Sequence, residues 1–124
     1  MRLLLDTHVF IWWRADDRKL TAEARHAIAR AEVAFVSVVT AWEAAIKRGL
    51  GRLELPESVE AGVTASGFTR LPIGFSHAEA IATLPRHHND PFDRMLVAQT
   101  TVERLTLVTH DAKFEPYGID IIWT

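Results

Sequence analysis

The feature that most constrains the fold is a set of short apolar segments in which polar and apolar residues do not alternate. Such segments are typical of strands covered on both faces, as in a parallel sheet. Stretches with helical periodicity separate them. This order predicts an α/β fold of three layers, with helices flanking a central parallel β-sheet. The expected strands are residues 2–5, 33–36, 105–108 and 119–122, with 69–73 as a weaker candidate.

Helix starts are predicted from residues that favour the N-cap. Aspartate favours this position and proline favours the first helical turn, so the Asp90-Pro91 pair is the strongest of these signals. The chain shows no linker, repeat or low-complexity segment, and residues 1–124 are therefore expected to form a single domain. We expect helices to begin at or next to Thr7, Thr21, Thr40, Ser76 and Asp90.

Composition excludes several classes of protein. Hydrophobic residues make up 48% of the chain and charged residues 24%, which favours a folded domain over a disordered one. Cysteine is absent, so disulfides and thiolate metal sites are excluded, and a cytoplasmic location is expected. No signal peptide or membrane span is predicted. The net charge of −2 argues against a general polyanion binder, but a local basic surface can still bind nucleic acid.

Four acidic residues are expected at one edge of the sheet. Asp6 and Asp111 follow strands, Glu43 lies in the helix after the second strand, and Asp93 lies in the first turn of the helix at Pro91. Ligands of open parallel sheets bind beyond the carboxyl ends of the strands. Carboxylates held together need a proton or a cation, and oxygen ligands suit Mg²⁺ or Mn²⁺. This pattern predicts a metal-dependent phosphodiester hydrolase.

Each acid also has a local structural alternative. Asp6 and Asp111 each stand where they can cap a following helix or turn. Glu43 has the spacing of a capping box with Thr40, and Asp93 favours a helix N-terminus through its charge. Capping does not require the capping residues to share one edge, so their joint placement favours a common site.

Four segments carry a family resemblance: LLLDTHVFIWW, SVVTAWEAAIKRGLGRL, HHNDPFDRMLVAQ and LVTHDAKFEPYGIDII. With these segments the chain resembles PIN-domain ribonucleases, and within them the VapC-type toxins of type II toxin–antitoxin pairs. The resemblance covers essentially the whole chain. It implies a Mg²⁺-dependent endoribonuclease, with Mn²⁺ as a possible substitute, that cuts transfer RNA or other structured translation RNA. It also implies inhibition by a cognate VapB-type antitoxin and a homodimer.

The resemblance places the family's acidic quartet on Asp6, Glu43, Asp93 and Asp111. Asp6 and Asp93 would bind the metal most directly, Asp111 would complete the metal shell, and Glu43 would hold the attacking water or act as its base. The segment DRMLVAQ aligns Asp93 with the third acid, which leaves Asp90 as a helix cap or an outer partner. Small hydroxyl residues beside the family's metal site would correspond to Thr7 and Thr109.

A histidine metal site is the main alternative for the segment HHNDPFD. His87 and His88 resemble a histidine–aspartate cluster, but His8, His26, His77 and His110 do not complete such a pattern. We expect His87 and His88 to lie on a loop at the rim of the site, where they contact RNA or solvent. RNA would need cations near the acids, and the candidates are Arg86, Arg94, Lys47 and Arg48, each of which can also belong to a solvated helix face.

The tryptophans are the last informative feature. Adjacent helical residues point about 100 degrees apart, so Trp12 and Trp13 cannot both face the core centrally. One of them is expected to be core and the other to line a groove for an antitoxin segment, unless both are partly buried. Trp42 is expected to be a packing residue.

Three other functions compete with the nuclease. A receiver domain would need a pair of acids after the first strand and a lysine after the fifth, and both are missing. A haloacid-dehalogenase phosphatase would need an aspartate where His8 stands. A non-catalytic PIN fold that only binds a partner would share every feature except activity. The RNA target and the number of metal ions stay open at this level.

Overall fold

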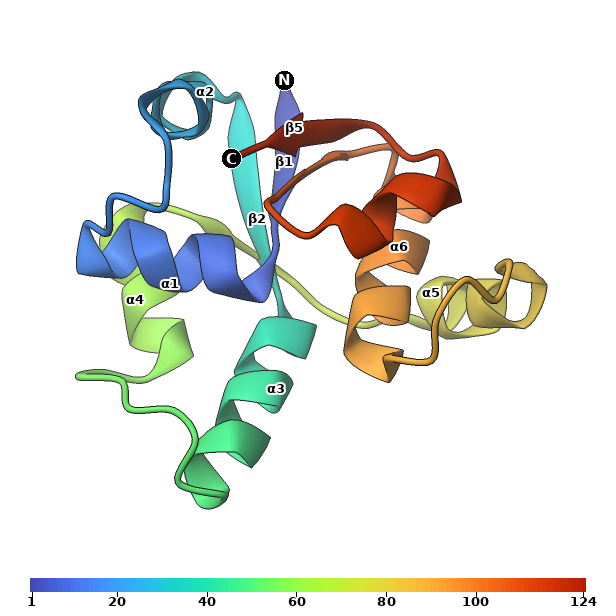
Figure 1. Cartoon of the computed structure of the whole chain (residues 1–124), viewed down its shortest axis with the longest axis horizontal. Helices are drawn as coiled ribbons and strands as arrows, with labels where there is room; N and C mark the ends of the chain where they lie inside the picture. Colours follow the sequence, from blue (N-terminus) through green and yellow to red (C-terminus); the bar gives the residue numbers. More distant parts are fainter.

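The computed structural model describes residues 1–124 and is built around a five-stranded sheet (Figure 1). All neighbouring strands are parallel, in the order β3-β2-β1-β4-β5. The three-layer α/β prediction is confirmed, and each strand begins within two residues of its expected start. The strands are β1 (Arg2–Leu5), β2 (Val33–Ser37), β3 (Thr69–Leu71), β4 (Thr106–Thr109) and β5 (Ile121–Trp123).

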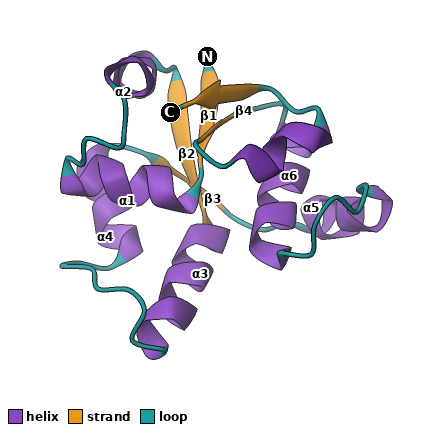
Figure 2. Ribbon diagram, viewed as in Figure 1, coloured by secondary structure: helices purple, strands orange, loops and turns teal.

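Helices cover both faces of the sheet (Figure 2). Helices α1, α2 and α4 lie on one side, α5 and α6 lie on the other, and α3 extends from the end of β2. None of the helices is long and apolar enough to cross a bilayer. The α-helices are α1 (Thr7–Ala15), α2 (Ala22–Arg30), α3 (Val38–Gly49), α4 (Val59–Ser66), α5 (Phe75–Ala80) and α6 (Pro91–Glu103), and the 3-10 helices are η1 (Ile81–Thr83) and η2 (Ala112–Tyr117).

The central strand β1 explains why the sequence shows an uninterrupted apolar run. Leu3, Leu4 and Leu5 are completely buried. Leu3 and Leu5 belong to the core between the sheet and α1, α2 and α4, whereas Leu4 belongs to the core under α6. Each buried leucine contributes roughly 1.5–3 kcal/mol to folding. Successive residues of β1 thus pack into the cores on opposite faces of the sheet. A polar side chain at any of these positions would be buried in apolar surroundings.

The caps of α2 and α6 are as predicted. Thr21 accepts a hydrogen bond from the backbone N–H of Ala24 at 3.2 Å, and Asp90 accepts one from that of Phe92 at 2.9 Å. Pro91 occupies the first turn of α6. At α6 the boundary follows from local capping chemistry. Thr21 is also held by a tertiary contact, because its N–H donates to the hydroxyl of Thr124 at 2.8 Å.

The predicted starts of α3 and α5 are wrong. Helix α3 begins at Val38 and is capped by Ser37, whose hydroxyl accepts the N–H of Val39 at 3.0 Å. Thr40 therefore lies inside α3 and forms no capping box with Glu43. Helix α5 begins at Phe75, after a Gly74 N-cap, rather than after Ser76. In both cases the helix starts closer to the preceding strand than expected.

No sequence pattern predicted helix α4. It is short, contains β-branched residues, and has Gly62 at its centre, all of which lower helix propensity. The structure gives the reason for the glycine. A Cβ atom at Gly62 would lie 3.0 Å from the Phe10 ring and 3.0 Å from the Glu57 carboxylate. Gly62 thus allows α1 to approach α4 closely.

An acidic cavity as the candidate functional site

A cavity of about 200 Å³ opens at the carboxyl edge of the sheet. It lies where the starts of α1, α6 and η2 meet α3, so its walls come from four separate parts of the chain. All four acids predicted from the sequence line this one cavity, and Asp90 joins them. The lining residues are Asp6, Thr7, His8, Glu43, Lys47, Asp90, Asp93, Asp111, Lys113 and Phe114.

Asp6 follows β1 and is only 4% exposed. One carboxylate oxygen caps α1 by accepting the N–H of Val9 at 2.8 Å, and the other accepts the hydroxyl of Thr109. Burial raises the pKa of Asp6 above its ordinary value, and the two hydrogen bonds and the nearby His8 and His110 offset this only in part. Asp6 therefore caps α1, as the local alternative predicted, and also lies in the wall of the cavity.

Glu43 is buried, and both of its carboxylate oxygens have partners. The hydroxyl of Thr7 donates to one oxygen at 2.7 Å, and the ammonium of Lys47 lies 2.9 Å from the other. Thr7 in turn lies 3.1 Å from the hydroxyl of Thr40. These contacts fix the direction in which the Glu43 carboxylate points.

The charges of the other cavity acids act together on Asp93. Burial and the negative charges of Asp90, Asp111, Glu43 and Asp6 raise the pKa of Asp93 to about 7. The effect of all four other acids on one carboxyl group shows how closely the cavity concentrates negative charge. At neutral pH the Asp93 carboxyl is therefore protonated in a large share of metal-free molecules.

Asp111 is half-buried and begins η2. Its carboxylate accepts the N–H of Lys113 at 3.0 Å, and its own N–H donates to the hydroxyl of Thr109 at 3.0 Å. Thr109 therefore connects Asp111 to Asp6. The predicted cap of a short turn is confirmed, and it coexists with a place in the cavity wall.

The donor chemistry of the cavity fits a hard divalent cation. Five carboxylates line it, and the ammonium groups of Lys47 and Lys113 offset only part of their charge. Cysteine is absent, and oxygen donors select Mg²⁺, Mn²⁺ or Ca²⁺ over softer metals. No three His, Asp or Glu side chains are close enough together to form a ready-made ligand set. Mg²⁺ keeps several waters and needs only one or two direct carboxylates, which such a cavity can supply.

The structure corrects the prediction that Arg94 binds RNA. Arg94 is only 6% exposed. Its guanidinium donates to the backbone carbonyls of Pro85 at 2.9 Å and Leu84 at 3.3 Å, and to the Tyr117 hydroxyl at 3.3 Å. Its role is to anchor the loop before α6. Arg86 and Arg48 are exposed, whereas Lys47 is paired with Glu43.

His87 and His88 lie on the loop before α6, as predicted, but outside the cavity wall. Their rings pack edge-on against Tyr117, with centroid distances of 4.8 and 5.5 Å. Together with Arg94 they fix this loop against η2.

Three residues of the cavity wall were not proposed for it from the sequence, namely His8, Lys113 and Phe114. His8 follows Asp6 by two positions and Lys113 follows Asp111 by two, and each lies in the first turn of the helix that its aspartate caps. The sequence offered one signal for His8 and Lys113, which is that each lies two positions after a predicted site acid.

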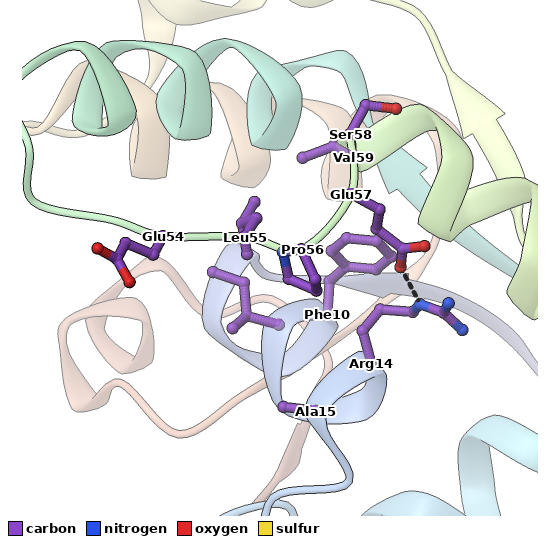
Figure 3. A pocket seen from close by; sticks show the side chains of 10 residues that line it. Phe10, Arg14, Ala15, Glu54, Leu55, Pro56, Glu57, Ser58 and Val59 are labelled. Atoms are coloured by element: carbon purple, nitrogen blue, oxygen red, sulfur yellow. Dashed lines mark hydrogen bonds and ion pairs between the residues drawn. The ribbon is translucent and has the colours of Figure 1, made fainter.

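A second hollow of about 120 Å³ lies between α1 and the segment that leads into α4 (Figure 3). Phe10, Ile11 and Leu55 contribute to its mainly apolar lining, and the Arg14–Glu57 ion pair, at 2.7 Å, lies at its edge. Neither Trp12 nor Trp13 lines this hollow.

Both early tryptophans are partly buried and pack against the core beneath α1, α2 and α4. The alternative of two partly buried rings is therefore confirmed for Trp12 and Trp13. Trp42 is 48% exposed and packs edge-on against Phe92 at 4.8 Å, so it is a packing residue on one side only.

Comparison with known proteins gives one consistent result. The family described as "PIN domain" matches residues 3–119. The protein named Ribonuclease VapC22 of Mycobacterium tuberculosis is 27% identical over 118 residues, which cover 93% of this chain and 91% of that protein. VapBC2 from Rickettsia felis, solved with a promoter DNA fragment, superposes with a TM-score of 0.74 at 14% identity and 98% coverage of both chains. DNA-bound VapBC from Salmonella typhimurium gives 0.70 at 20% identity, with 98% and 97% coverage.

Proposed function

The chain belongs to the PIN-domain family, and from that premise we propose that it is a divalent-metal-dependent endoribonuclease, the toxin of a toxin–antitoxin pair. The observation that carries this proposal is the single cavity in which Asp6, Glu43, Asp93 and Asp111 meet. The relative named as a ribonuclease and the similarity to VapBC toxin–antitoxin structures support RNA as the substrate class and a VapB-type antitoxin as the partner.

Asp6, Asp93 and Asp111 are the residues that would hold the cation, with Mg²⁺ as the physiological ion and Mn²⁺ as a substitute. When bound, the cation supplies positive charge to the cavity and to the phosphate, and it lowers the pKa of water. Thr109 donates to the Asp6 carboxylate, which orients that group, and accepts from the backbone N–H of Asp111, which fixes the start of η2.

Glu43 is the proposed base that accepts the proton of the attacking water. Thr7 and Lys47 hold its carboxylate in one orientation, which reduces the cost of aligning it at the moment of reaction. The Lys47 ammonium also faces the cavity and can attract the RNA backbone.

The charge of the cavity bears on the number of cations. Four ionised acids and one divalent cation would leave a net negative charge that repels phosphate. A second cation or a proton on one acid relieves this repulsion, and the raised pKa of Asp93 supports the proton in the resting state. We expect cleavage to depend on Mg²⁺ concentration to the first order, and a second-order dependence would favour two cations.

The nuclease proposal is tested by incubating the purified protein with pooled cellular RNA, with Mg²⁺ and with chelator. We expect cleavage only with Mg²⁺, and at least a 100-fold loss in Glu43→Gln, which keeps the shape of the side chain. Glu54→Gln is the matched control, because Glu54 is exposed and lies outside the cavity. No cleavage of any RNA by the wild-type protein would contradict the proposal.

Transfer RNA or another structured translation RNA is the proposed substrate, and the cytoplasm is the proposed location. An endonuclease that reads unpaired bases acts on loops, where the bases are accessible. The target and the cleavage position are identified by expressing the protein with and without its cognate antitoxin and sequencing the RNA ends that appear.

A catalytically idle PIN fold that only binds a partner is the second candidate function. The presence of all four acids and their hydroxyl partners disfavours it. A receiver domain is disfavoured by topology, because the sheet order β3-β2-β1-β4-β5 differs from the 2-1-3-4-5 order of receiver domains.

The hollow beside α1 is the proposed contact for the antitoxin. Its lining is apolar and its volume suits an apolar side chain, with the Arg14–Glu57 pair available to polar groups at the edge. We expect Ile11→Glu to weaken capture of the co-expressed antitoxin at least tenfold in a pull-down titration, and Val102→Glu, on the exposed face of α6, to leave it unchanged. Equal capture by both variants would place the antitoxin elsewhere.

A homodimer is the proposed assembly, and an exposed apolar stripe on α3 supports it. The stripe consists of four apolar residues spaced four positions apart, and the exposed fractions of these residues lie between 42% and 61%. A contiguous apolar surface of this kind is unusual for a monomer. Sedimentation analysis of Ile46→Glu should show a monomer where the wild-type protein shows a dimer. The stripe consists of Val38, Trp42, Ile46 and Leu50.

A further inference from the structure

Three aromatic rings form a cluster beside the acidic cavity. His8 and Trp12 lie one helical turn apart on α1, and His110 follows β4. The centroid distances are 5.7 Å between His8 and His110, 4.6 Å between Trp12 and His110, and 6.1 Å between His8 and Trp12. The Lys19 ammonium lies 5.9 Å from the Trp12 ring. We call His8, Trp12 and His110 the aromatic rim.

The aromatic rim is accessible rather than part of the core. Both histidines are exposed, Trp12 is half-buried, and neither imidazole makes a hydrogen bond to a protein group. Trp12 packs against the core and against His110, whereas the polar edges of the two imidazoles have no hydrogen-bond partner within the fold. Core packing accounts for Trp12 but not for the two exposed imidazoles beside its ring.

The aromatic rim lies at the edge of the acidic cavity. His8 itself lines the cavity, and His110 immediately precedes Asp111. The hollow proposed for the antitoxin uses other residues of α1, namely Phe10, Ile11 and Arg14. Helix α1 therefore presents one set of side chains to the hollow and another to the edge of the acidic cavity.

We propose that the aromatic rim binds an unpaired base of RNA next to the phosphate that lies over the acidic cavity. This inference rests on the proposed nuclease function and names how that site selects single-stranded RNA. Bases stack on aromatic rings without strict sequence preference, and the ring nitrogens of His8 and His110 can form hydrogen bonds with a base or sugar edge. Lys19 and Lys113 supply positive charge for the backbone on either side.

The first test measures binding and cleavage of a labelled single-stranded RNA oligonucleotide. Trp12→Leu keeps apolar packing and removes the ring, and His110→Ala removes an exposed ring. Because stacking of one base changes affinity by about tenfold, we expect each variant to raise KM about tenfold with a much smaller change in kcat. His26→Ala and Phe75→Leu are matched controls, because both rings are exposed and lie away from the cavity.

Direct binding is measured by fluorescence anisotropy in the Glu43→Gln background, where cleavage is absent. An RNA with one abasic nucleotide beside the cleavage position serves as the second probe. We expect the abasic RNA to bind more weakly than intact RNA to the parent protein, and equally to the Trp12→Leu variant. This double-mutant cycle assigns the lost affinity to contact between that base and the ring.

The outcomes separate this inference from the proposed function. Cleavage and binding that are unchanged in Trp12→Leu and His110→Ala would overturn the aromatic rim and leave the nuclease intact. A wild-type protein that binds RNA through the aromatic rim but never cleaves it would overturn the nuclease alone. Loss of antitoxin capture in these variants with unchanged RNA binding would show that the rings serve the protein partner and would also overturn the inference.

Discussion

At the scale of single residues, Asp93 is the clearest case of stability given up for a site. Its carboxyl group is partly buried among four other acids, which raises its pKa to about 7. Ionisation of Asp93 therefore costs folding free energy in the absence of a cation. Replacing a destabilised site residue by a neutral one commonly stabilises a protein and removes its activity.

We predict that Asp93→Asn raises the melting temperature at pH 8 in chelator by several degrees, because it removes an unfavourable charge. A change of 1 kcal/mol shifts the melting temperature by roughly 2–8 °C in domains of comparable size. RNA cleavage should fall at least 100-fold in the same variant. Scanning calorimetry and a cleavage assay measure the two effects.

Asp120→Asn is the charge-matched control for Asp93→Asn, because Asp120 is exposed and lies outside the cavity. It should change neither property. A lower melting temperature for Asp93→Asn in chelator would contradict this prediction and would mean that the Asp93 carboxyl group makes a net favourable interaction in the folded protein.

Asp6 and Asp111 could be placed at one edge from the sequence, because each follows a strand and parallel strands end at the same edge. Glu43 and Asp93 lie on helices, so their place in the cavity was expected from the joint pattern and the family resemblance rather than from strand ends. Asp6 and Asp111 were also predicted as caps, and the structure shows that one carboxylate can do both. Arg94 could not be assigned in this way. Its neighbour Asp93 faces the cavity, but the next position on a helix points about 100 degrees away, and only tertiary packing reveals the carbonyls that it meets.

At the scale of elements, the start of α6 combines a cap with an electrostatic effect. Asp90 caps the helix through the N–H groups of Phe92 and Asp93, and its charge raises the pKa of Asp93. The cap stabilises α6, whereas the charge of Asp90 makes ionisation of Asp93 at neutral pH less favourable and so lowers stability. Substitutions of Asp90 can separate these two effects.

We predict that Asp90→Asn lowers the pKa of Asp93 and keeps the cap, since asparagine caps helices as well as aspartate does. Asp90→Ala should lower the same pKa and also lose about 1 kcal/mol of stability with the cap. Urea denaturation at pH 5 and at pH 8, with NMR titration of Asp93, distinguishes the variants. Equal stability of the two variants at both pH values would show that the cap contributes nothing.

The loop before α6 provides a second prediction. Arg94 donates to two backbone carbonyls and to Tyr117 from a nearly buried position. We predict that Arg94→Met lowers the free energy of unfolding by about 2–3 kcal/mol, because buried carbonyls lose a charged donor. Arg86→Met, which alters an exposed arginine of the same loop, should change it by less than about 0.5 kcal/mol. Urea denaturation measures both values.

Strands were predicted more accurately than helices for a physical reason. A strand covered on both faces must be apolar throughout, and this constraint is visible in any short window, as in Leu3–Leu5. Helix α4 depends on a close approach to α1 that only Gly62 permits, and this contact is invisible to local propensity. The start of α3 was misplaced because Ser37 and Thr40 are both residue types favoured at N-caps, and the sequence does not show that the strand ends at Ser37.

At the scale of the whole molecule, the acidic cavity links pH, cation binding and folding. The pKa of Asp93 rises from 3.8 to about 7 on folding, so the folded state holds more protons between these values. This group therefore makes the metal-free protein less stable as pH rises from about 4 to 7. A cation competes with the proton and reverses the penalty.

We predict that the rise in melting temperature caused by saturating Mg²⁺ is larger at pH 8 than at pH 5. A cation at 100 times its dissociation constant stabilises a folded protein by about 2.7 kcal/mol, and protonation of Asp93 reduces that effect. Thermal melts with Mg²⁺ and with chelator at both pH values give the difference. In Asp93→Asn the rise in melting temperature caused by Mg²⁺ should be nearly the same at both pH values. A pH dependence that persists in this variant would mean that other groups cause it.

The central position of β1 has a consequence for synthesis of the chain. Strand β1 is synthesised before the other strands of the sheet, yet it lies between β2 and β4, and Asp6 completes its contacts through Val108 and Thr109. A nascent chain that stops short of β4 holds Asp6 without Thr109 or Asp111. A partial chain that ends before β4 therefore cannot form the complete acidic cavity, whatever part of the fold it has already adopted.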